Sequence, residues 1–281
     1  MNAPASSKAS TGTPATVSPV LLDINSIGIS FGGLKAVQDF SLQLPAAGLF
    51  GLIGPNGAGK TTIFNLLTGV YEPDCGEIHL ASRRLFNRQP HEITAAGIAR
   101  TFQNIRLFPD LSVLDNVRLA GQLHHQHGLL STLLRTRGYR REEQLLQKKA
   151  FNLLGIFELQ DRAYELASNL SYGHQRKLEI VRALATNPKV LLLDEPAAGL
   201  NPQEKKLLAR SIQQIRDRFQ VAVLLIEHDM PLVMEICENI IVLDHGITIC
   251  RGTPREVQND KRVIAAYLGS GLTDEESSPA A

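Results

Sequence analysis

Residues 54–61 read Gly-Pro-Asn-Gly-Ala-Gly-Lys-Thr, which completes the pattern GxxxxGK[ST]. In this pattern the glycines let the backbone curl, so that successive N–H groups point at phosphate oxygens. The positive end of the following helix adds to that attraction. Lys60 would reach the β- and γ-phosphates of a nucleotide, and the hydroxyl of Thr61 would bind Mg²⁺. Since an apolar run precedes the loop and a helical pattern follows it, these residues predict a site for a nucleoside triphosphate.

Two carboxylates, Asp194 and Glu195, come directly after the aliphatic run 190–193. A buried parallel strand that ends in Asp places the carboxylate at the carboxyl edge of the sheet, where open α/β folds bind ligands. We expect Asp194 to hold Mg²⁺, directly or through water, and Glu195 to polarise an attacking water. Many strands end in an acidic turn, so this pattern alone is weak evidence for a nucleotide site. It becomes strong evidence because the sequence also contains the phosphate loop.

Residues 170–175, Leu-Ser-Tyr-Gly-His-Gln, lie between these two segments and precede a helical pattern. The apolar face of that helix is marked by Leu178, Val181, Leu184 and Ala185. Ser171 and Gly173 are expected to precede the helix, where free N–H groups and the helix dipole can bind a γ-phosphate. An ordinary N-cap is the alternative explanation, and only the order of the motifs favours phosphate binding.

The elements that must position these residues follow from the hydrophobic pattern. Short aliphatic runs at 49–54, 190–193 and 221–226 suit parallel strands that are buried on both faces and separated by helices. Residues 21–30 alternate apolar and polar side chains, as a half-buried strand does. The stretch from about 111 to 166 is helical in pattern and charged. We therefore predict an α/β core that contains a helical insert.

Composition excludes several classes of protein. The 281 residues include 29 Lys+Arg and 28 Asp+Glu, and a charge this balanced gives no support to a nucleic-acid binder. No apolar run approaches the ~18–20 residues that span a bilayer. Cys75, Cys237 and Cys250 show no metal-ligand spacing, so we interpret all three as small buried hydrophobic residues in a reducing compartment. We expect a soluble intracellular protein.

The motif order resembles that of the ATP-binding subunits of ABC transporters. The phosphate loop is followed by Gln103, then by Leu170-Ser171-Tyr172-Gly173, then by Asp194-Glu195, and finally by His228. At finer scale the sequence resembles the ATPases of branched-chain amino-acid importers. The segments that carry this second resemblance are residues 100–108, 196–202, 226–230, 251–254 and 266–269.

This resemblance implies a fold, a P-loop NTPase core with a mostly parallel sheet, an N-terminal antiparallel β subdomain and an inserted helical subdomain at about 104–168. The ATP-binding domain would cover residues 20–269. Residues 1–19, rich in Ala, Ser, Thr and Pro, are expected to form a disordered leader and not a secretion signal, and residues 270–281 a polar tail.

Roles for single residues also follow from the resemblance. Glu195 would be the general base, and His228 would contact the γ-phosphate and orient the water. Gln103 would sense Mg²⁺ and couple the site to the helical insert, and Phe31 would stack on adenine. Together with Lys60 these residues would perform catalysis. The implied nucleotide contacts are Phe31, Gly54, Pro55, Asn56, Gly57, Ala58, Gly59, Lys60, Thr61, Thr62, Ser171, Tyr172 and Gly173, and the implied metal ligands are Thr61, Gln103 and Asp194.

Two positions depart from the family pattern, since Asn201 stands where the family usually has Asp and His174 where it usually has Gln. The chain holds a single set of motifs, whereas the family's hydrolytic site pairs the phosphate loop of one subunit with residues 170–173 of another. We therefore expect hydrolysis only in a dimer, with an identical or a homologous ATPase as partner.

The remaining expected partners are two transmembrane permease subunits and, indirectly, an extracytoplasmic substrate-binding protein. ATP and Mg²⁺ are the expected cofactors, and the cytoplasmic face of the inner membrane is the expected location. The leading hypothesis is uptake of branched-chain or related amino acids. Other cargo, such as urea, an amide or an exported lipid, is an alternative, and so is a soluble ABC ATPase outside transport. A GTPase is disfavoured because the sequence lacks an NKxD motif.

Two weaker patterns lie in the insert. His124, His125 and His127 cluster without a flanking carboxylate or Cys, so a solvated face is preferred to a metal site. Residues 135–149 carry six basic and two acidic side chains. Contact with anionic lipid headgroups is one hypothesis, and an ordinary exposed helix is preferred.

Overall fold

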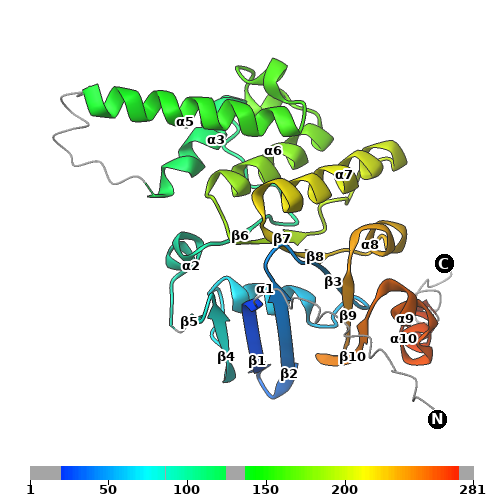
Figure 1. The fold of residues 1–281 in the computed structure, drawn as a ribbon. Coiled ribbons are helices and arrows are strands. Elements are labelled where there is room, and N and C mark those ends of the chain that lie inside the picture. The colour runs from blue at the N-terminus through cyan, green and yellow to red at the C-terminus, as the bar shows by residue number, and fades with distance from the viewer. Residues whose placement is uncertain (1–19, 86, 125–136, 272–281) are drawn as a thin grey trace, which may run out of the picture.

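The computed structural model describes residues 20–85, 87–124 and 137–271. A six-stranded sheet forms the centre of the protein, in the order β10-β9-β3-β8-β7-β6 (Figure 1). Neighbouring strands are parallel, except that β10 runs antiparallel to β9. Their bounds are β3 Leu49–Ile53, β6 Ile98–Arg100, β7 Val190–Asp194, β8 Ala222–Ile226, β9 Asn239–Asp244 and β10 Ile247–Gly252.

The three aliphatic runs become the three central strands, which confirms that part of the prediction. Every residue of β3, β7 and β8 is buried, because helices or a second sheet cover both faces. The side chains alternate between two cores: Leu191 and Leu193 pack in one, while Leu192 packs in the other. The third strand begins one residue later than predicted, at Ala222.

A second, antiparallel sheet has the order β2-β1-β4-β5 and confirms the expected N-terminal β subdomain. Its strands are β1 Val20–Phe31, β2 Leu34–Pro45, β4 Cys75–Leu80 and β5 Arg83–Arg84. Gly32 and Gly33 connect β1 to β2 at φ angles of 53° and 89°, which glycine adopts without steric cost. The buried face of this sheet packs with α1 (Lys60–Leu67) and one face of the central sheet.

The opposite face of the central sheet is covered by helices, among them α6 (Tyr172–Ala185) and α7 (Pro202–Phe219). The predicted helical insert lies beyond them, as Figure 1 shows. It contains α3 Val113–Gly121, η1 Gln122–His124, α5 Arg137–Ile156, η2 Gln160–Arg162 and η3 Ala167–Asn169. The other helices are α2 Pro90–Ala96, α8 Met230–Ile236, α9 Pro254–Asn259 and α10 Lys261–Gly271.

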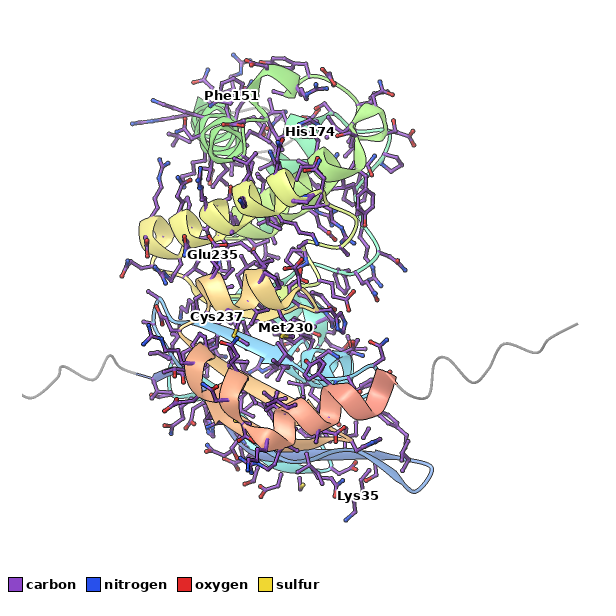
Figure 2. The ribbon with its side chains drawn as sticks, turned by 90° about the vertical axis from the view of Figure 1, so that its right-hand side faces the viewer. Lys35, Phe151, His174, Met230, Glu235 and Cys237 are labelled. Atoms are coloured by element: carbon purple, nitrogen blue, oxygen red, sulfur yellow. The ribbon has the colours of Figure 1, made fainter. Side chains whose placement is uncertain are left out.

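In Figure 2, His174 and Phe151 lie in the helical half of the molecule, and Lys35 lies at the far end of the antiparallel sheet. The expected leader, residues 272–281 of the expected tail, His125 and His127 lie outside the described residues, whereas positions 270 and 271 of the expected tail belong to α10. Among the described helices, none has the length and apolar character needed to cross a bilayer.

The interpretation of the cysteines is wrong for one of the three. Cys237 and Cys250 are buried, as expected, and burial raises the pKa of Cys237 to about 12. Cys75 is exposed, because it begins β4 where that strand pairs with Gly28 of β1.

Candidate active site

The phosphate loop, residues 54–61, connects β3 to α1 and needs glycine at two positions. At Gly54, with φ of 151°, a Cβ atom would lie 2.1 Å from the carbonyl oxygen of Leu243. At Gly59, with φ of 102°, a Cβ atom would lie 2.6 Å from the carbonyl oxygen of Ala36. Both contacts are to backbone, so a side chain at either position would displace the loop.

Lys60 is the first residue of α1 and is buried, with 6% of its surface exposed. Its Nζ donates hydrogen bonds to the carbonyl oxygens of Gly54 at 2.8 Å and Pro55 at 2.9 Å. Burial lowers the pKa of Lys60, and the charges of Glu195 and Asp194 oppose that shift. The loop thus holds its ammonium group against its own backbone, next to two acidic side chains.

A cavity of about 380 Å³ opens beside the phosphate loop. Its walls bring together four sequence-predicted positions that are far apart in the chain: the phosphate loop, Gln103, Glu195 and His228. Residues 171–173 are not among its lining residues. Phe31 lies outside the lining as well and is 44% exposed, packing edge-on against Tyr71 with ring centroids 5.1 Å apart.

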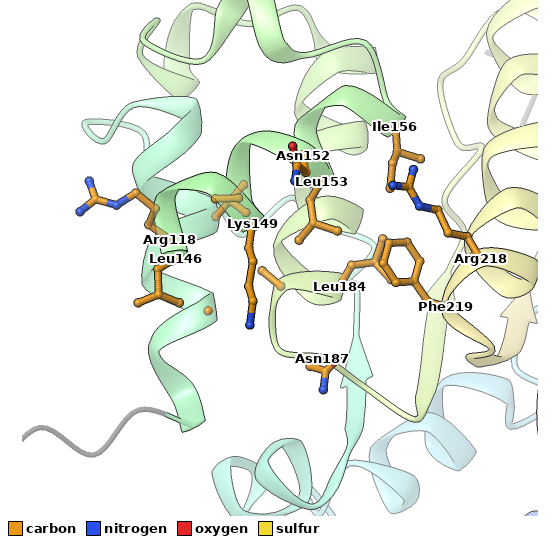
Figure 3. Close-up of a pocket in the computed structure, with 14 residues that line it drawn as sticks. Arg118, Leu146, Lys149, Asn152, Leu153, Ile156, Leu184, Asn187, Arg218 and Phe219 are labelled. Carbon is orange, nitrogen blue, oxygen red and sulfur yellow. The ribbon is translucent and has the colours of Figure 1, made fainter. Parts of the chain in front are cut away.

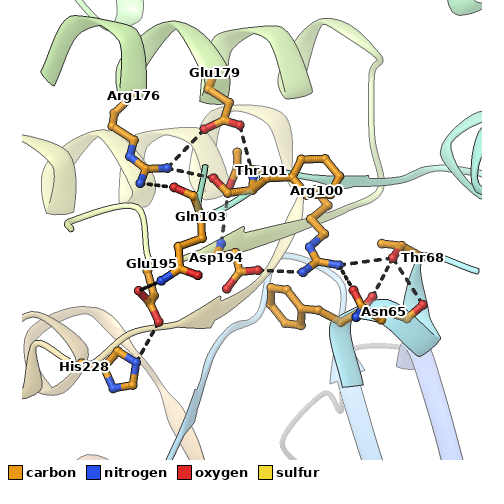
Figure 4. A network of polar contacts seen from close by, with 12 residues as sticks. Asn65, Thr68, Arg100, Thr101, Gln103, Arg176, Glu179, Asp194, Glu195 and His228 are labelled. Atoms are coloured by element: carbon orange, nitrogen blue, oxygen red, sulfur yellow. Dashed lines mark hydrogen bonds and ion pairs between the residues drawn. The ribbon is translucent and has the colours of Figure 1, made fainter. Parts of the chain in front are cut away.

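Glu195 is fixed from both sides in this cavity, as Figure 4 shows. Its Oε2 accepts a hydrogen bond from Gln103 Nε2 at 3.0 Å, and its Oε1 lies 2.8 Å from His228 Nε2. The backbone of Glu195 has a φ of 49°, in the left-handed region, and its N–H donates to the Ile226 carbonyl at 2.9 Å. Such a conformation costs on the order of 1–3 kcal/mol in a residue other than glycine and is typical of functional sites.

Asp194 contacts a residue that the sequence analysis did not single out. Arg100, the last residue of β6, places Nη2 2.7 Å from Asp194 Oδ2, and each side chain is 5% exposed. Arg100 Nη1 also donates to Asn65 Oδ1 at 2.7 Å. The Arg100 guanidinium lies 5.4 Å from the Phe64 ring and 5.1 Å from the Phe102 ring. An Arg in a short apolar strand is the one sequence signal that could have pointed to it.

The start of α6 differs in detail from the prediction. Ser171 is the N-cap residue, but Gly173 lies within the first turn of the helix and does not precede it. Ser171 Oγ lies 2.8 Å from Nδ1 of His174, so the hydroxyl bonds this side chain and not the helix backbone. Burial lowers the pKa of His174, and the charges of Arg162 and Lys177 act in the same direction.

Asn201, the second position that departs from the family pattern, is the N-cap of α7. Its Oδ1 accepts hydrogen bonds from the backbone N–H groups of Gln203 and Glu204, each at 3.0 Å. An amide oxygen serves this capping role as well as a carboxylate does.

Another cavity, of about 590 Å³, lies in the helical half between α3, α5, α6 and α7 (Figure 3). Leu146, Leu153 and Phe219 give it apolar walls, and none of the predicted nucleotide contacts lines it. It is therefore separate from the phosphate-loop cavity.

A glycine-rich phosphate loop between the parallel strand β3 and helix α1, with two acidic residues at the end of β7, which β8 separates from β3 in the same sheet, defines a P-loop nucleoside triphosphatase core. The family model "ABC transporter" matches residues 37–198, and the model "Branched-chain amino acid ATP-binding cassette transporter" matches residues 248–272. The chain belongs to the ATP-binding subunits of the ABC transporter family, and it is an ATPase.

Curated relatives cover nearly the whole chain. It is 46% identical to the high-affinity branched-chain amino acid transport ATP-binding protein LivG of Salmonella typhimurium, over 90% of this chain and 99% of the relative. It is 42% identical to the corresponding protein BraF of Pseudomonas aeruginosa, over 89% of this chain and 98% of the relative. Among solved structures, the crystal structure of the ADP conformation of an ATP-binding cassette of an ABC transporter is similar to this chain. The TM-score is 0.78 and the sequence identity 30%, over 90% of this chain and all of that chain.

Proposed function

We propose that this chain is the ATP-hydrolysing subunit of an importer that takes up branched-chain or related amino acids through separate membrane subunits. The observation that carries the proposal is the 46% identity, across 90% of the chain, to a protein named for branched-chain amino acid transport. The match of residues 248–272 to the family model "Branched-chain amino acid ATP-binding cassette transporter" supports it as well.

In this proposal the cavity beside the phosphate loop binds ATP, and Phe31 contacts the adenine. Backbone N–H groups of the loop and Lys60 bind the phosphates. Thr61, Asp194 and Gln103 would hold Mg²⁺, since they offer the hydroxyl, carboxylate and amide oxygens that this ion prefers. When bound, the ion would neutralise negative charge on the phosphates during transfer.

Glu195 is the proposed general base. A water oxygen bonds to the γ-phosphorus as the bond to the β,γ-bridging oxygen breaks, and Glu195 accepts a proton from that water. Its two hydrogen-bonding neighbours, Gln103 and His228, hold the carboxylate in one orientation. Positioning of this kind, together with electrostatic stabilisation, is how a protein accelerates phosphoryl transfer.

The site is proposed to be completed by a second ATPase subunit. Residues 171–173 do not line the cavity. We propose that the free N–H groups at this start of α6 bind a nucleotide held by another subunit. We place this subunit at the cytoplasmic face of the membrane, where two permease subunits and, indirectly, a substrate-binding protein complete the importer.

A groove next to the Gln103 loop is the proposed contact for the permease. Its volume is about 370 Å³, and it lies between α2, β6, α3 and α6. The exposed apolar side chains of Val70, Phe108, Leu119 and Leu123 line it, together with three arginines, Arg100, Arg106 and Arg182. The groove shares Phe102 with the loop that carries Gln103, so a segment bound there would act directly on that loop.

The experiment is uptake of radiolabelled leucine and of urea by cells that lack this chain, complemented with wild type or Glu195→Gln. We expect wild type alone to restore leucine uptake and neither to change urea uptake. Purification of the chain from native membranes should also yield the permease subunits. Restored urea uptake with unchanged leucine uptake would contradict the proposed cargo while leaving the ATPase assignment intact.

A further inference from the structure

Arg176 joins the start of α6 to the loop that carries Gln103. Its guanidinium donates two hydrogen bonds to the phenolic oxygen of Tyr172, from Nε at 3.1 Å and from Nη2 at 2.8 Å. It also donates to the backbone carbonyls of Phe102, from Nη1 at 2.8 Å, and of Gln103, from Nη2. Arg176 is 3% exposed, so these bonds form in an environment of low dielectric where they are strong.

Glu179, one turn further along α6, completes the connection. Its Oε1 accepts from the backbone N–H groups of Phe102 at 3.2 Å and Arg106 at 3.4 Å, and its Oε2 lies 3.5 Å from Arg176 Nη1. Burial raises the pKa of Glu179, while these bonds act against the shift. The Gln103 loop is thus attached to α6 by charged groups at several backbone atoms (Figure 4).

Tyr172 lies at the surface end of this network. Its side chain is partly exposed, at 47% for the residue, whereas its hydroxyl is bonded to the buried Arg176. A Cβ atom on Gly199 would lie 2.9 Å from Tyr172 Cε1, so the ring also packs against the segment that follows Glu195. Tyr172 is therefore connected to Glu195 by two routes, one through Arg176 and the Gln103 loop and one through the segment that contains Gly199.

From Tyr172 a series of hydrogen bonds reaches the proposed base, with the residue Gln103 itself joining its two halves. Arg176 holds the backbone of Gln103, and the side chain of Gln103 donates to Glu195 at 3.0 Å. Glu195 is in turn bonded to His228 at 2.8 Å. One end of this series lies beside the proposed contact with the partner's nucleotide, and the other end lies in the subunit's own cavity.

We propose that Tyr172 and Arg176 are positioning residues that make Glu195 of one site respond to the nucleotide bound at the other. A nucleotide that the partner presents to the N-terminus of α6 shifts Tyr172, and Arg176 transmits the shift to Gln103 and Glu195. The inference rests on the proposed composite site, and it adds a coupling between the two sites of the dimer.

The test is Tyr172→Phe, which removes only the hydroxyl that Arg176 contacts and keeps the ring. Tyr164→Phe is the matched control, because Tyr164 is 76% exposed and contributes to neither cavity described above. Each variant is assayed as the ATPase dimer with its native partner. Loss of two hydrogen bonds to a charged donor should lower kcat about tenfold, with the KM for ATP and ATP-driven dimerisation unchanged.

Hydrogen exchange of the amides of residues 102–106 gives a readout other than turnover. ATP should slow exchange at these amides in wild type and in Tyr164→Phe, but not in Tyr172→Phe. Arg176→Lys should reproduce the phenotype of Tyr172→Phe. The double variant should be no worse than either single variant, since both changes interrupt one series of contacts.

A kcat of Tyr172→Phe within twofold of the control would overturn the inference. Equal losses of ATP affinity and turnover would overturn it as well, because Tyr172 would then act at the subunit interface and not through Arg176. Failure of the composite site is recognised separately: a Glu195→Gln variant that does not dimerise with ATP contradicts the proposed function itself.

Discussion

Arg100 and Asp194 form a buried ion pair across the ends of two adjacent parallel strands, with Nη2 and Oδ2 2.7 Å apart. The same guanidinium bonds Asn65 on the phosphate-loop helix α1 and lies near the ring of Phe102, one residue before Gln103. A single side chain thus fixes the proposed metal ligand relative to the phosphate loop and the Gln103 loop.

Replacement of Arg100 by Met should lower the free energy of unfolding by about 3–5 kcal/mol, because it leaves Asp194 buried without its counter-charge. Arg100→Lys should lose less, since it keeps the charge and loses the planar fork. Arg84→Met is the control, because Arg84 pairs with Glu77 at a half-exposed position and should change stability by less than about 1 kcal/mol. Urea denaturation measures all three, and equal losses at positions 100 and 84 would contradict the account.

This ion pair shows where prediction from the sequence ends. The phosphate loop, the helix that follows this loop and the central strands could be predicted, because each is determined by residues that are close together in the sequence. Arg100 is separated from Asn65 by 35 positions and from Asp194 by 94, so only the assembled sheet brings them together. The strands β6, β9 and β10 also went unpredicted, because β6 is only three residues long and β9 and β10 lie beyond the motifs.

Two local errors have equally physical causes. Gly173 was expected before the helix, although a glycine is also tolerated in a first turn, where the backbone N–H groups have no partner within the helix. In the structure it lies in the first turn, where a Cβ atom would approach Glu204 Oε1 to 2.9 Å. Cys75 was expected to be buried on its residue type alone, whereas the pairing of β4 with β1 leaves it exposed.

Lys60→Ala should weaken ATP binding by roughly 10–100-fold, because it removes a charge-assisted contact to the phosphates. Equilibrium binding of a fluorescent ATP analogue measures the effect. Lys206→Ala, an exposed lysine on α7, is the matched control and should bind as wild type does. Unchanged binding by Lys60→Ala would contradict the assignment of the phosphate loop.

Asp229 should make stability depend on pH in acid. Its Oδ2 lies 2.6 Å from Lys205 Nζ and its Oδ1 caps α8 at Leu232 N, 3.0 Å away. These contacts, the bond to Lys205 above all, lower the pKa of Asp229 below its ordinary value of 3.8. Because the folded pKa is depressed, the stabilisation is fully present above about pH 4 and is lost as the pH falls through the folded pKa.

Asp229→Asn keeps the capping oxygen and removes the charge, so it should cost about 0.5–1 kcal/mol at neutral pH. The difference from wild type should shrink as the pH falls from 4 toward 3. Lys205→Met should give a similar loss, and the double variant should lose little more. A difference between wild type and Asp229→Asn that stays constant down to pH 3 would contradict the assignment of the loss to the charge of Asp229.

The central claim is that Glu195 takes the proton from the attacking water in a site that two subunits complete. The direct measurement is ATP turnover of Glu195→Gln, together with its oligomeric state in ATP by size-exclusion chromatography with light scattering. The account predicts normal ATP binding, a fall in kcat of at least about 100-fold, and accumulation of a stable ATP-bound dimer that wild type does not retain. Steady-state hydrolysis at the wild-type rate would contradict the assignment of Glu195 as the base.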